Sequence, residues 1–245
     1  MTILYFAPHQ DDELIVLGVD LCKSTRSNPA TTHVYLCTDG SASGVRKSLC
    51  NGACDCTLHE EPHHFHLTVD EFIAARDREY RLSCAAMGVP EENIHISPLR
   101  QRDQELSFEA AEQIILDALS KIPVGEPVSV RTISPLYAHR KQQDDHKNLG
   151  LAATKLFREG KFQELVLILE YEAMEDCFQR FPETSFTEIQ ADTDDFEKLT
   201  TAAAAYRRWN PENGFYAVGY HSVQGEFVTL LGDPRTIVHG SLENP

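Results

Sequence analysis

Short apolar runs alternate with amphipathic stretches over residues 2 to 171 of the chain. The apolar runs have the length of buried strands, and the stretches between them carry one apolar face, as a packed helix does. We expect strands at 2–7, 32–38, 93–97, 127–134 and 164–171. We expect helices at 12–23, 68–88, 107–121 and 145–158. Because alternating strands and helices are typical of a parallel sheet covered by helices, the pattern predicts an α/β fold with a doubly wound, mostly parallel sheet and helices on both faces.

The pattern changes after residue 172, where a helix is expected near 194–209 and two short strands at 215–220 and 226–231. No internal repeat and no linker rich in Pro, Gly or Ser divides the chain. We therefore expect one domain over residues 1–245, with a Cys/His-rich insert loop at 45–67 and a C-terminal extension of the same domain at 172–245.

One helix start is marked by its own side chains. Thr68 and Glu71 have the Thr-x-x-Glu spacing of a capping box, in which each side chain satisfies the other residue's free backbone N–H. Gly88 is placed to end the same helix. These residues predict a helix that begins directly after the insert.

Composition and charge narrow the possible partners. The 245 residues are 42% hydrophobic and 24% charged, as in ordinary globular proteins. The formal net charge is −16, so the average field repels phosphate backbones and anionic lipids. No apolar run approaches the roughly 18 residues of a spanning helix, and the acidic residues at 11–13 come too early for a signal peptide. We therefore expect no nucleic-acid partner, no membrane insertion and a cytoplasmic location.

The loops that follow two of the predicted strands carry most of the candidate chemistry. Ligands of such sheets bind outside the carboxyl ends of the strands. The loop after strand 2–7 lacks the glycines of a dinucleotide site and instead offers His9, Asp11 and Asp12, which suggest two metal ligands and a general base. The loop after strand 127–134 offers His146 as a third ligand, with His139 as a competitor. The alternative is that the acidic residues only complement a helix dipole and the histidines are structural.

The same segments resemble a known family, the LmbE-like or PIG-L zinc-dependent de-N-acetylases. Residues 8–13 (PHQDDE) are similar to that family's Ala-His-Pro-Asp-Asp-Glu motif, and residues 143–146 (QDDH), with Gly150 four residues on, are similar to its His-Pro-Asp-His motif. The Thr-Asp-Gly at 38–40, the Arg-x-x-Glu at 76–79 leading to Met-Gly-Val at 87–89, and the Asp-Gln-Glu-Leu at 103–106 also match in order. The resemblance implies a Rossmann-like fold, one Zn²⁺ or another divalent metal per chain, and removal of an N-acetyl or other N-acyl group from an amino sugar, such as N-acetylglucosamine, or from a glycoside.

Carried over position by position, the resemblance assigns roles to individual residues. His9, Asp12 and His146 match the metal ligands, and Asp11 matches the general base. Arg76 matches a substrate-contacting arginine, and we place Asp39, Gln143 and His139 with it in the substrate-binding part of the site. Gln143 stands where the family usually has a histidine that assists the oxyanion. Because glutamine donates a hydrogen bond but carries no charge, either the metal suffices, or Lys141, His139 or His221 substitutes, or the reaction is slow.

The insert carries a second group of potential metal ligands. Seven cysteines are an odd count for a disulfide framework, but three of them crowd beside a histidine: Cys50, Cys54, Cys56 and His59, with His63, His64 and His66 close behind. Thiolates and imidazoles at this density predict a possible second, structural zinc. The spacing matches no standard zinc finger, so a flexible lid with incidental thiols and a redox switch stay as alternatives.

These observations favour a metal-dependent hydrolase acting on a small N-acylated amino sugar or glycoside. The first alternative is a catalytically weak or silent member of the fold that binds metal or sugar, which the glutamine at 143 suggests and the retained Asp11 opposes. A nucleotide-binding oxidoreductase or methyltransferase is disfavoured because its glycine fingerprint is absent. The sequence leaves open a homo-oligomer.

Overall fold

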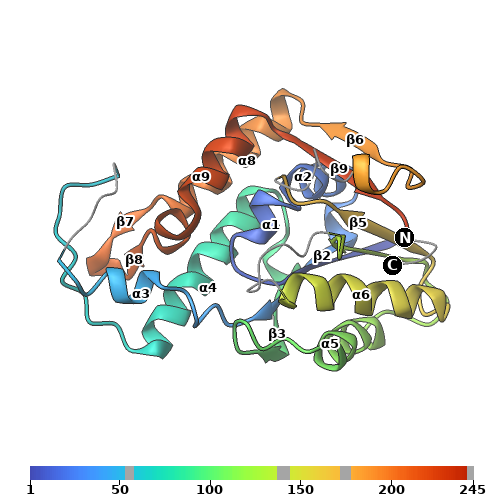
Figure 1. Cartoon of the computed structure of the whole chain (residues 1–245), viewed down its shortest axis with the longest axis horizontal. Coiled ribbons are helices and arrows are strands. Elements are labelled where there is room, and N and C mark those ends of the chain that lie inside the picture. The colour runs from blue at the N-terminus through green and yellow to red at the C-terminus, as the bar shows by residue number, and fades with distance from the viewer. Residues whose placement is uncertain (53–57, 137–143, 172–177, 242–245) are drawn as a thin grey trace.

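The computed structural model describes residues 1–52, 58–136, 144–171 and 178–241. Its seven-stranded sheet has the order β3-β2-β1-β4-β5-β9-β6 (Figure 1). The five strands on one side are parallel to one another, and β9 runs antiparallel to both β5 and β6. The strands are β1 (Thr2–Ala7), β2 (Thr32–Thr38), β3 (Ile94–Gln101), β4 (Val128–Ile133), β5 (Glu164–Ile168), β6 (Thr187–Gln190) and β9 (Arg235–His239).

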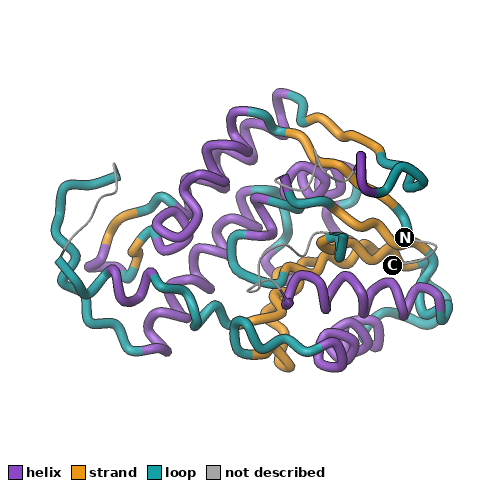
Figure 2. The backbone as a smooth tube through the Cα atoms, viewed as in Figure 1, coloured by secondary structure: helices purple, strands orange, loops and turns teal. Residues whose placement is uncertain are grey.

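Helices cover both faces of the sheet, as expected for a doubly wound fold (Figure 2). They are α1 (Asp12–Ile15), α2 (Gly18–Ser27), α3 (Val45–Ser48), α4 (Val69–Ala86), α5 (Phe108–Ser120), α6 (Asp144–Arg158), α8 (Thr193–Tyr206) and α9 (Val218–Gly232). A small hairpin of β7 (Trp209–Asn210) and β8 (Phe215–Tyr216) lies apart from the main sheet, beside α3. The predicted mostly parallel sheet and the two helical layers are confirmed.

The central strand β1 divides the core into two layers. All six of its residues are buried, and successive side chains point to opposite faces of the sheet. Ile3, Tyr5 and Ala7 pack against α2, α4, α8 and α9, whereas Leu4 and Phe6 pack against α5 and α6. A strand buried on both sides reads as a continuous apolar run, which is why it was identifiable in the sequence.

Several predicted helix and strand boundaries are confirmed to within a few residues. The capping box at Thr68 is present: its hydroxyl accepts from the Glu71 backbone N–H, and the Glu71 carboxylate accepts from the Thr68 N–H. The helix predicted at 12–23 is interrupted, because α1 ends at Ile15 and α2 begins at Gly18.

The prediction of a strand at 226–231 is wrong, because these residues belong to α9. Phe227 and Leu230 are buried while Val228 between them is 63% exposed, which is the three-residue spacing of a helix. Of the strand predicted at 215–220, only Phe215–Tyr216 forms a strand, and α9 begins at Val218. The strands that complete the sheet, β6 and β9, were not predicted. Among the described residues, no helix is both long enough and apolar enough to cross a membrane.

Candidate active site

Two loops of neighbouring parallel strands bring the candidate ligands together. His9 follows β1 and His146 lies in the first turn of α6, after β4, and these two strands pair directly. The strand order reverses between them, since β2 and β3 continue on one side and β5 on the other. This is where a doubly wound sheet opens a crevice for ligands. The fold therefore places the residues of two distant motifs at one topological switch point.

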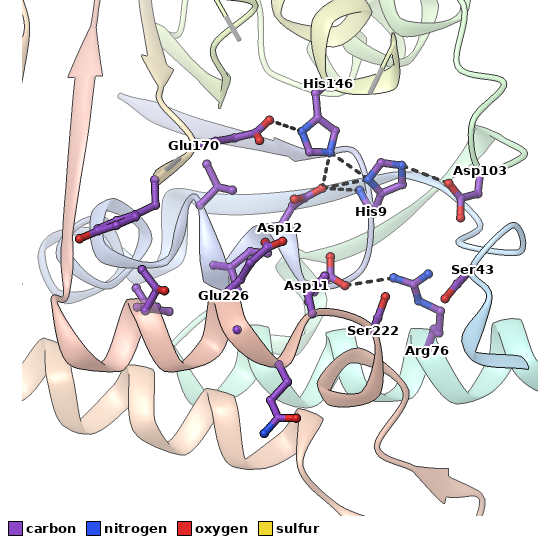
Figure 3. Close-up of a pocket in the computed structure, with 18 of the residues that line it drawn as sticks. His9, Asp11, Asp12, Ser43, Arg76, Asp103, His146, Glu170, Ser222 and Glu226 are labelled. Atoms are coloured by element: carbon purple, nitrogen blue, oxygen red, sulfur yellow. Dashed lines mark hydrogen bonds and ion pairs between the residues drawn. The ribbon is translucent and has the colours of Figure 1, made fainter. Parts of the chain in front are cut away.

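His9, Asp12 and His146 converge on a common point (Figure 3). His9 Nδ1 lies 3.2 Å from Asp12 Oδ2 and 3.0 Å from His146 Nε2. His146 Nε2 lies 3.2 Å from the same Asp12 oxygen. Ligands about 2.0–2.1 Å from a tetrahedral zinc are roughly 3.3 Å apart, so the three atoms form a triangle of nearly the size that such an ion requires.

Carboxylates behind the two histidines determine which ring nitrogen faces the triangle. His9 Nε2–H donates to Asp145 Oδ2 at 3.1 Å and faces Asp103 Oδ1 at 3.3 Å. His146 Nδ1–H donates to Glu170 Oε1 at 2.6 Å. A nitrogen that donates carries the proton, so the opposite nitrogen of each ring, His9 Nδ1 or His146 Nε2, keeps a lone pair for a metal. The donor set and its supports fit a divalent ion.

The electrostatics of the triangle also favour a cation. Burial opposes charge on His9, but its hydrogen bonds to Asp103, Asp12 and Asp145 outweigh burial and raise its pKa well above the usual range. Burial likewise opposes charge on His146, and the Asp12 carboxylate raises the pKa of this imidazole to about 10. A site that draws protons onto two buried imidazoles stabilises positive charge, which a divalent metal would supply instead.

Asp11 projects from the same turn but is held apart from the triangle. Its φ of 115° is a conformation that residues other than glycine rarely adopt, so the surrounding contacts must stabilise it. Its backbone N–H donates to Glu13 Oε2, and the other oxygen of Glu13 accepts from the Tyr206 hydroxyl. Burial raises the pKa of the Asp11 carboxyl well above its usual range. Asp11 is thus a buried, strongly basic carboxylate next to the triangle of His9, Asp12 and His146.

Arg76, on α4, connects the loops that carry these residues. Its Nη2 donates to the Gln10 carbonyl at 2.7 Å and to Asp11 Oδ2 at 3.2 Å, and its Nη1 donates to the Gly40 carbonyl. Gly40 has a φ of 68°, and a Cβ there would meet Gln10 and Arg76 side-chain atoms below 3 Å, so only glycine fits. Asp39 accepts from the backbone N–H groups of Ser41 and Asp103, and its carboxylate therefore orders the loop.

A cavity of about 770 Å³ opens over the triangle and Asp11. Its floor includes His9, Asp11, Asp12, Arg76 and His146. The segment after β5 also lines the cavity, with Leu169, Glu170 and Tyr171, and α9 contributes Ser222 and Glu226. Figure 3 shows Glu170 beside His146. The volume lies within the usual range for small-molecule sites.

The structure brings together His9, Asp11, Asp12, His146 and Arg76, which the sequence had singled out as one site. Gln143 and His139 lie outside the described residues, as do Cys54 and Cys56. Cys50 Sγ faces the carbonyls of Arg46 and Phe65, and His59 packs against His63.

Sequence reasoning missed the outer carboxylates Asp103, Asp145 and Glu170. The first two lie inside segments matched to the family, and Asp145 also accepts from the backbone N–H groups of Gln104 and Leu106. Glu170 was assigned to the strand at 164–171, but β5 ends at Ile168. A carboxylate that directly follows a third strand end was the available signal.

Fold and site together define an α/β protein whose sheet carries a His–Asp–His cluster and a basic carboxylate at the switch point. Residues 4–157 match the PIG-L family, described as GlcNAc-PI de-N-acetylase, and the chain belongs to this family. No curated protein matches the sequence.

Solved structures with a similar fold include two deacetylases. An N,N'-diacetylchitobiose deacetylase from Pyrococcus horikoshii is 18% identical with a TM-score of 0.56, and the match covers 94% of this chain and 76% of that one. A deacetylase of teicoplanin biosynthesis is 15% identical with a TM-score of 0.58, and the match covers both chains completely. GalB, a 4-carboxy-2-hydroxymuconate hydratase from Pseudomonas putida, is 13% identical with a TM-score of 0.54, covering 100% of this chain and 98% of that one. Because the last is named as a hydratase, the fold alone does not specify the reaction.

Proposed function

We propose that the protein is a metal-dependent N-deacetylase that removes an acetyl or related acyl group from an amino sugar or glycoside. The observation that carries the proposal is the triangle of His9 Nδ1, Asp12 Oδ2 and His146 Nε2, with the Asp11 carboxylate beside it. Membership of a de-N-acetylase family and the two deacetylase neighbours support the same reaction.

The proposed chemistry divides between a bound ion and the protein's own side chains. When bound to His9, Asp12 and His146, a divalent ion such as Zn²⁺ supplies a Lewis acid that polarises an amide carbonyl and acidifies water. Asp11 takes the proton of the attacking water on its Oδ1, since Oδ2 accepts from Arg76 Nη2. The same carboxyl then returns the proton to the departing amine. Arg76 holds Asp11 in place, and we propose that it also contacts the substrate at the cavity floor.

A metal analysis combined with an amine-release screen tests the proposal. The purified protein should contain a divalent metal, of which His146→Ala loses one equivalent, and it should release free amine from at least one N-acetylated amino sugar or glycoside. Asp11→Asn serves as the matched control, because it should keep the metal without turnover. A metal-loaded protein that releases no amine from any of these substrates would favour the silent binding alternative.

A further inference from the structure

A second cluster of histidines lies away from the cavity, where the insert meets the C-terminal extension. His59 and His63 belong to the loop before α4, and His221 lies in the first turn of α9. Figure 1 shows this loop beside the β7–β8 hairpin at the left end of the molecule. One potential ligand atom from each of the three imidazoles lies within 4.8 Å of the other two. Segments about 160 positions apart in the sequence thus bring three imidazoles together.

Within the cluster, the rings approach one another through nitrogen atoms and ring edges, and not face to face. His63 Nε2 and His59 Nε2 are 3.2 Å apart, close to the spacing of two ligands on one tetrahedral ion. His221 meets the planes of His59 and His63 at 73° and 83°, so it is edge-on to both rings. Stacking alone does not require this convergence of nitrogens.

The protonation states of the cluster suit a metal. His221 Nδ1 faces two acceptors, the carbonyls of Ala217 at 2.8 Å and Tyr216 at 3.1 Å, so this nitrogen carries the proton and Nε2 keeps the lone pair. The side chain of His63 is buried, with the residue only 2% exposed, and its Nδ1 has no hydrogen-bond partner among the described residues. Burial lowers the pKa of all three imidazoles, which favours the neutral form of each ring.

A supporting shell holds the three rings in place. Trp209 stacks on His59 with ring centroids 3.5 Å apart and a 14° angle between planes. The indole Nε1–H donates to Glu61 Oε2 at 2.7 Å, which fixes the tryptophan against the same loop. Locked side chains around a ligand set are typical of a built metal site.

We propose that His59, His63 and His221 form a second metal site that takes Zn²⁺ or another divalent ion of similar ligand preference. Three imidazoles suit Zn²⁺, Cu²⁺ and Ni²⁺, whereas Mg²⁺ and Ca²⁺ prefer oxygen ligands. This site differs from the cysteine-containing cluster expected from the sequence, because its third histidine comes from the C-terminal extension. It is also independent of the proposed deacetylation.

The position of the site gives it a consequence for the cavity. Ser222, the neighbour of His221, lines the cavity with Gln224 and Glu226 further along α9. A metal bound by the cluster would connect the loop before α4 to the start of this helix. We expect it to order the α9 wall without touching the His9–Asp12–His146 triangle.

Metal stoichiometry tests the proposal without relying on turnover. The apo-protein is loaded with Zn²⁺, passed through a desalting column and analysed by mass spectrometry of the metal. Wild type should hold two equivalents, and His59→Gln and His221→Gln should each hold one. The matched controls are His64→Gln and His66→Gln, exposed histidines of the same loop, which should hold two. Two equivalents in both cluster variants, or one equivalent in wild type that both cluster variants keep, would overturn the proposal.

A second measurement separates the two sites and covers variants that fold poorly. His9→Ala/His146→Ala removes two of the three candidate ligands of the active-site triangle and should retain one Zn²⁺ equivalent. In this variant, Zn²⁺ but not Mg²⁺ should slow hydrogen exchange of the backbone amides at 58–67 and 218–222. Loss of one cluster ligand should weaken Zn²⁺ binding by more than the roughly 10- to 100-fold typical of an outer-shell change. Equal exchange with and without Zn²⁺ would contradict a site at this position.

Discussion

Neighbouring carboxylates determine which nitrogen of each histidine in the candidate active site can bind a metal. An imidazole offers two nitrogens, and only the one without a proton can bind a metal. In His146 the 2.6 Å hydrogen bond from Nδ1 to Glu170 leaves Nε2 facing Asp12. The same logic applies to His9, where Asp145 and Asp103 occupy Nε2. Each histidine of the candidate site is therefore supported by at least one carboxylate behind it.

Replacing Glu170 with glutamine should weaken the metal site without abolishing it. The amide oxygen can still accept from His146 Nδ1, but the negative charge that makes the imidazole a stronger ligand is lost. We expect Glu170→Gln to lower Zn²⁺ affinity by about 10- to 100-fold, measured by competition with a chelator. Glu112→Gln, which breaks a surface pair with Lys155, is the matched control and should leave affinity unchanged. Equal affinities in the two variants would remove Glu170 from the site.

Asp11→Asn should separate metal binding from catalysis. The amide preserves the shape of the side chain and can still meet Arg76, but it cannot take a proton from water. Loss of a general base typically costs on the order of 100- to 10,000-fold in rate, whereas the metal content should stay at the wild-type value. Activity of Asp11→Asn within a few fold of wild type would end the assignment of this residue as the base.

At the scale of elements, the sequence predicted strands whose residues are buried throughout. It was misleading where an element mixes buried and exposed residues. Strand β1 is buried on both faces and reads as a continuous apolar run. Residues 226–231 are also largely apolar, but their burial follows helical spacing, and a short apolar run does not distinguish the two periods. β6 is a mostly exposed edge strand of four residues, so its pattern carries little apolar signal.

The strength of the local sequence pattern also explains which site residues could be predicted. The candidate ligands lie in compact motifs at strand ends, so the sequence could single them out. Glu170 was hidden because the apolar run of β5 was extended over it, although the strand stops two residues earlier. His221 could not be linked to His59, since only the folding of α9 against the insert brings these residues together.

The contact between α6 and β4 sets the position of His146. Gly150 lies one turn after this histidine, and a Cβ there would meet the Ile133 carbonyl at 2.6 Å and Pro135 Cδ at 2.7 Å. Gly150→Ala should therefore push the helix away from the strand, destabilise the protein by roughly 1–3 kcal/mol and weaken metal binding as His146 moves. Urea denaturation and chelator competition measure the two effects.

Gly232→Ala is the control for this helix displacement, because nothing lies within 4 Å of a Cβ at that position. It should leave both stability and metal affinity close to wild type. If Gly150→Ala is destabilised but binds metal normally, then helix position and ligand geometry are not coupled in the way the contact suggests.

At the scale of the whole molecule, the strand β9 pairs between β5 and β6, next to the loops that carry the candidate site. His239 at the end of β9 donates from Nδ1 to the Gly240 carbonyl, and its Nε2 accepts from the Ser134 hydroxyl at 2.7 Å. Ser134 follows β4, the strand whose loop leads to His146. A neutral imidazole, buried to 3% exposure, therefore joins β9 to the end of β4.

This contact predicts how stability depends on pH. Burial lowers the pKa of His239 to about 4, whereas an unfolded histidine titrates near 6.5. Between these values the unfolded chain binds a proton here that the folded chain does not, so the free energy of unfolding falls as the pH decreases from 6.5 to 4. The contribution has a slope of up to about 1.4 kcal/mol per pH unit.

His239→Gln keeps a polar side chain but removes the titration. Urea denaturation of the metal-free proteins at several pH values should therefore show a shallower decline for the variant, because its other titrating groups, including His9 and His146, are shared with wild type. Parallel curves for the two proteins across this window would mean that His239 is not held neutral by the fold.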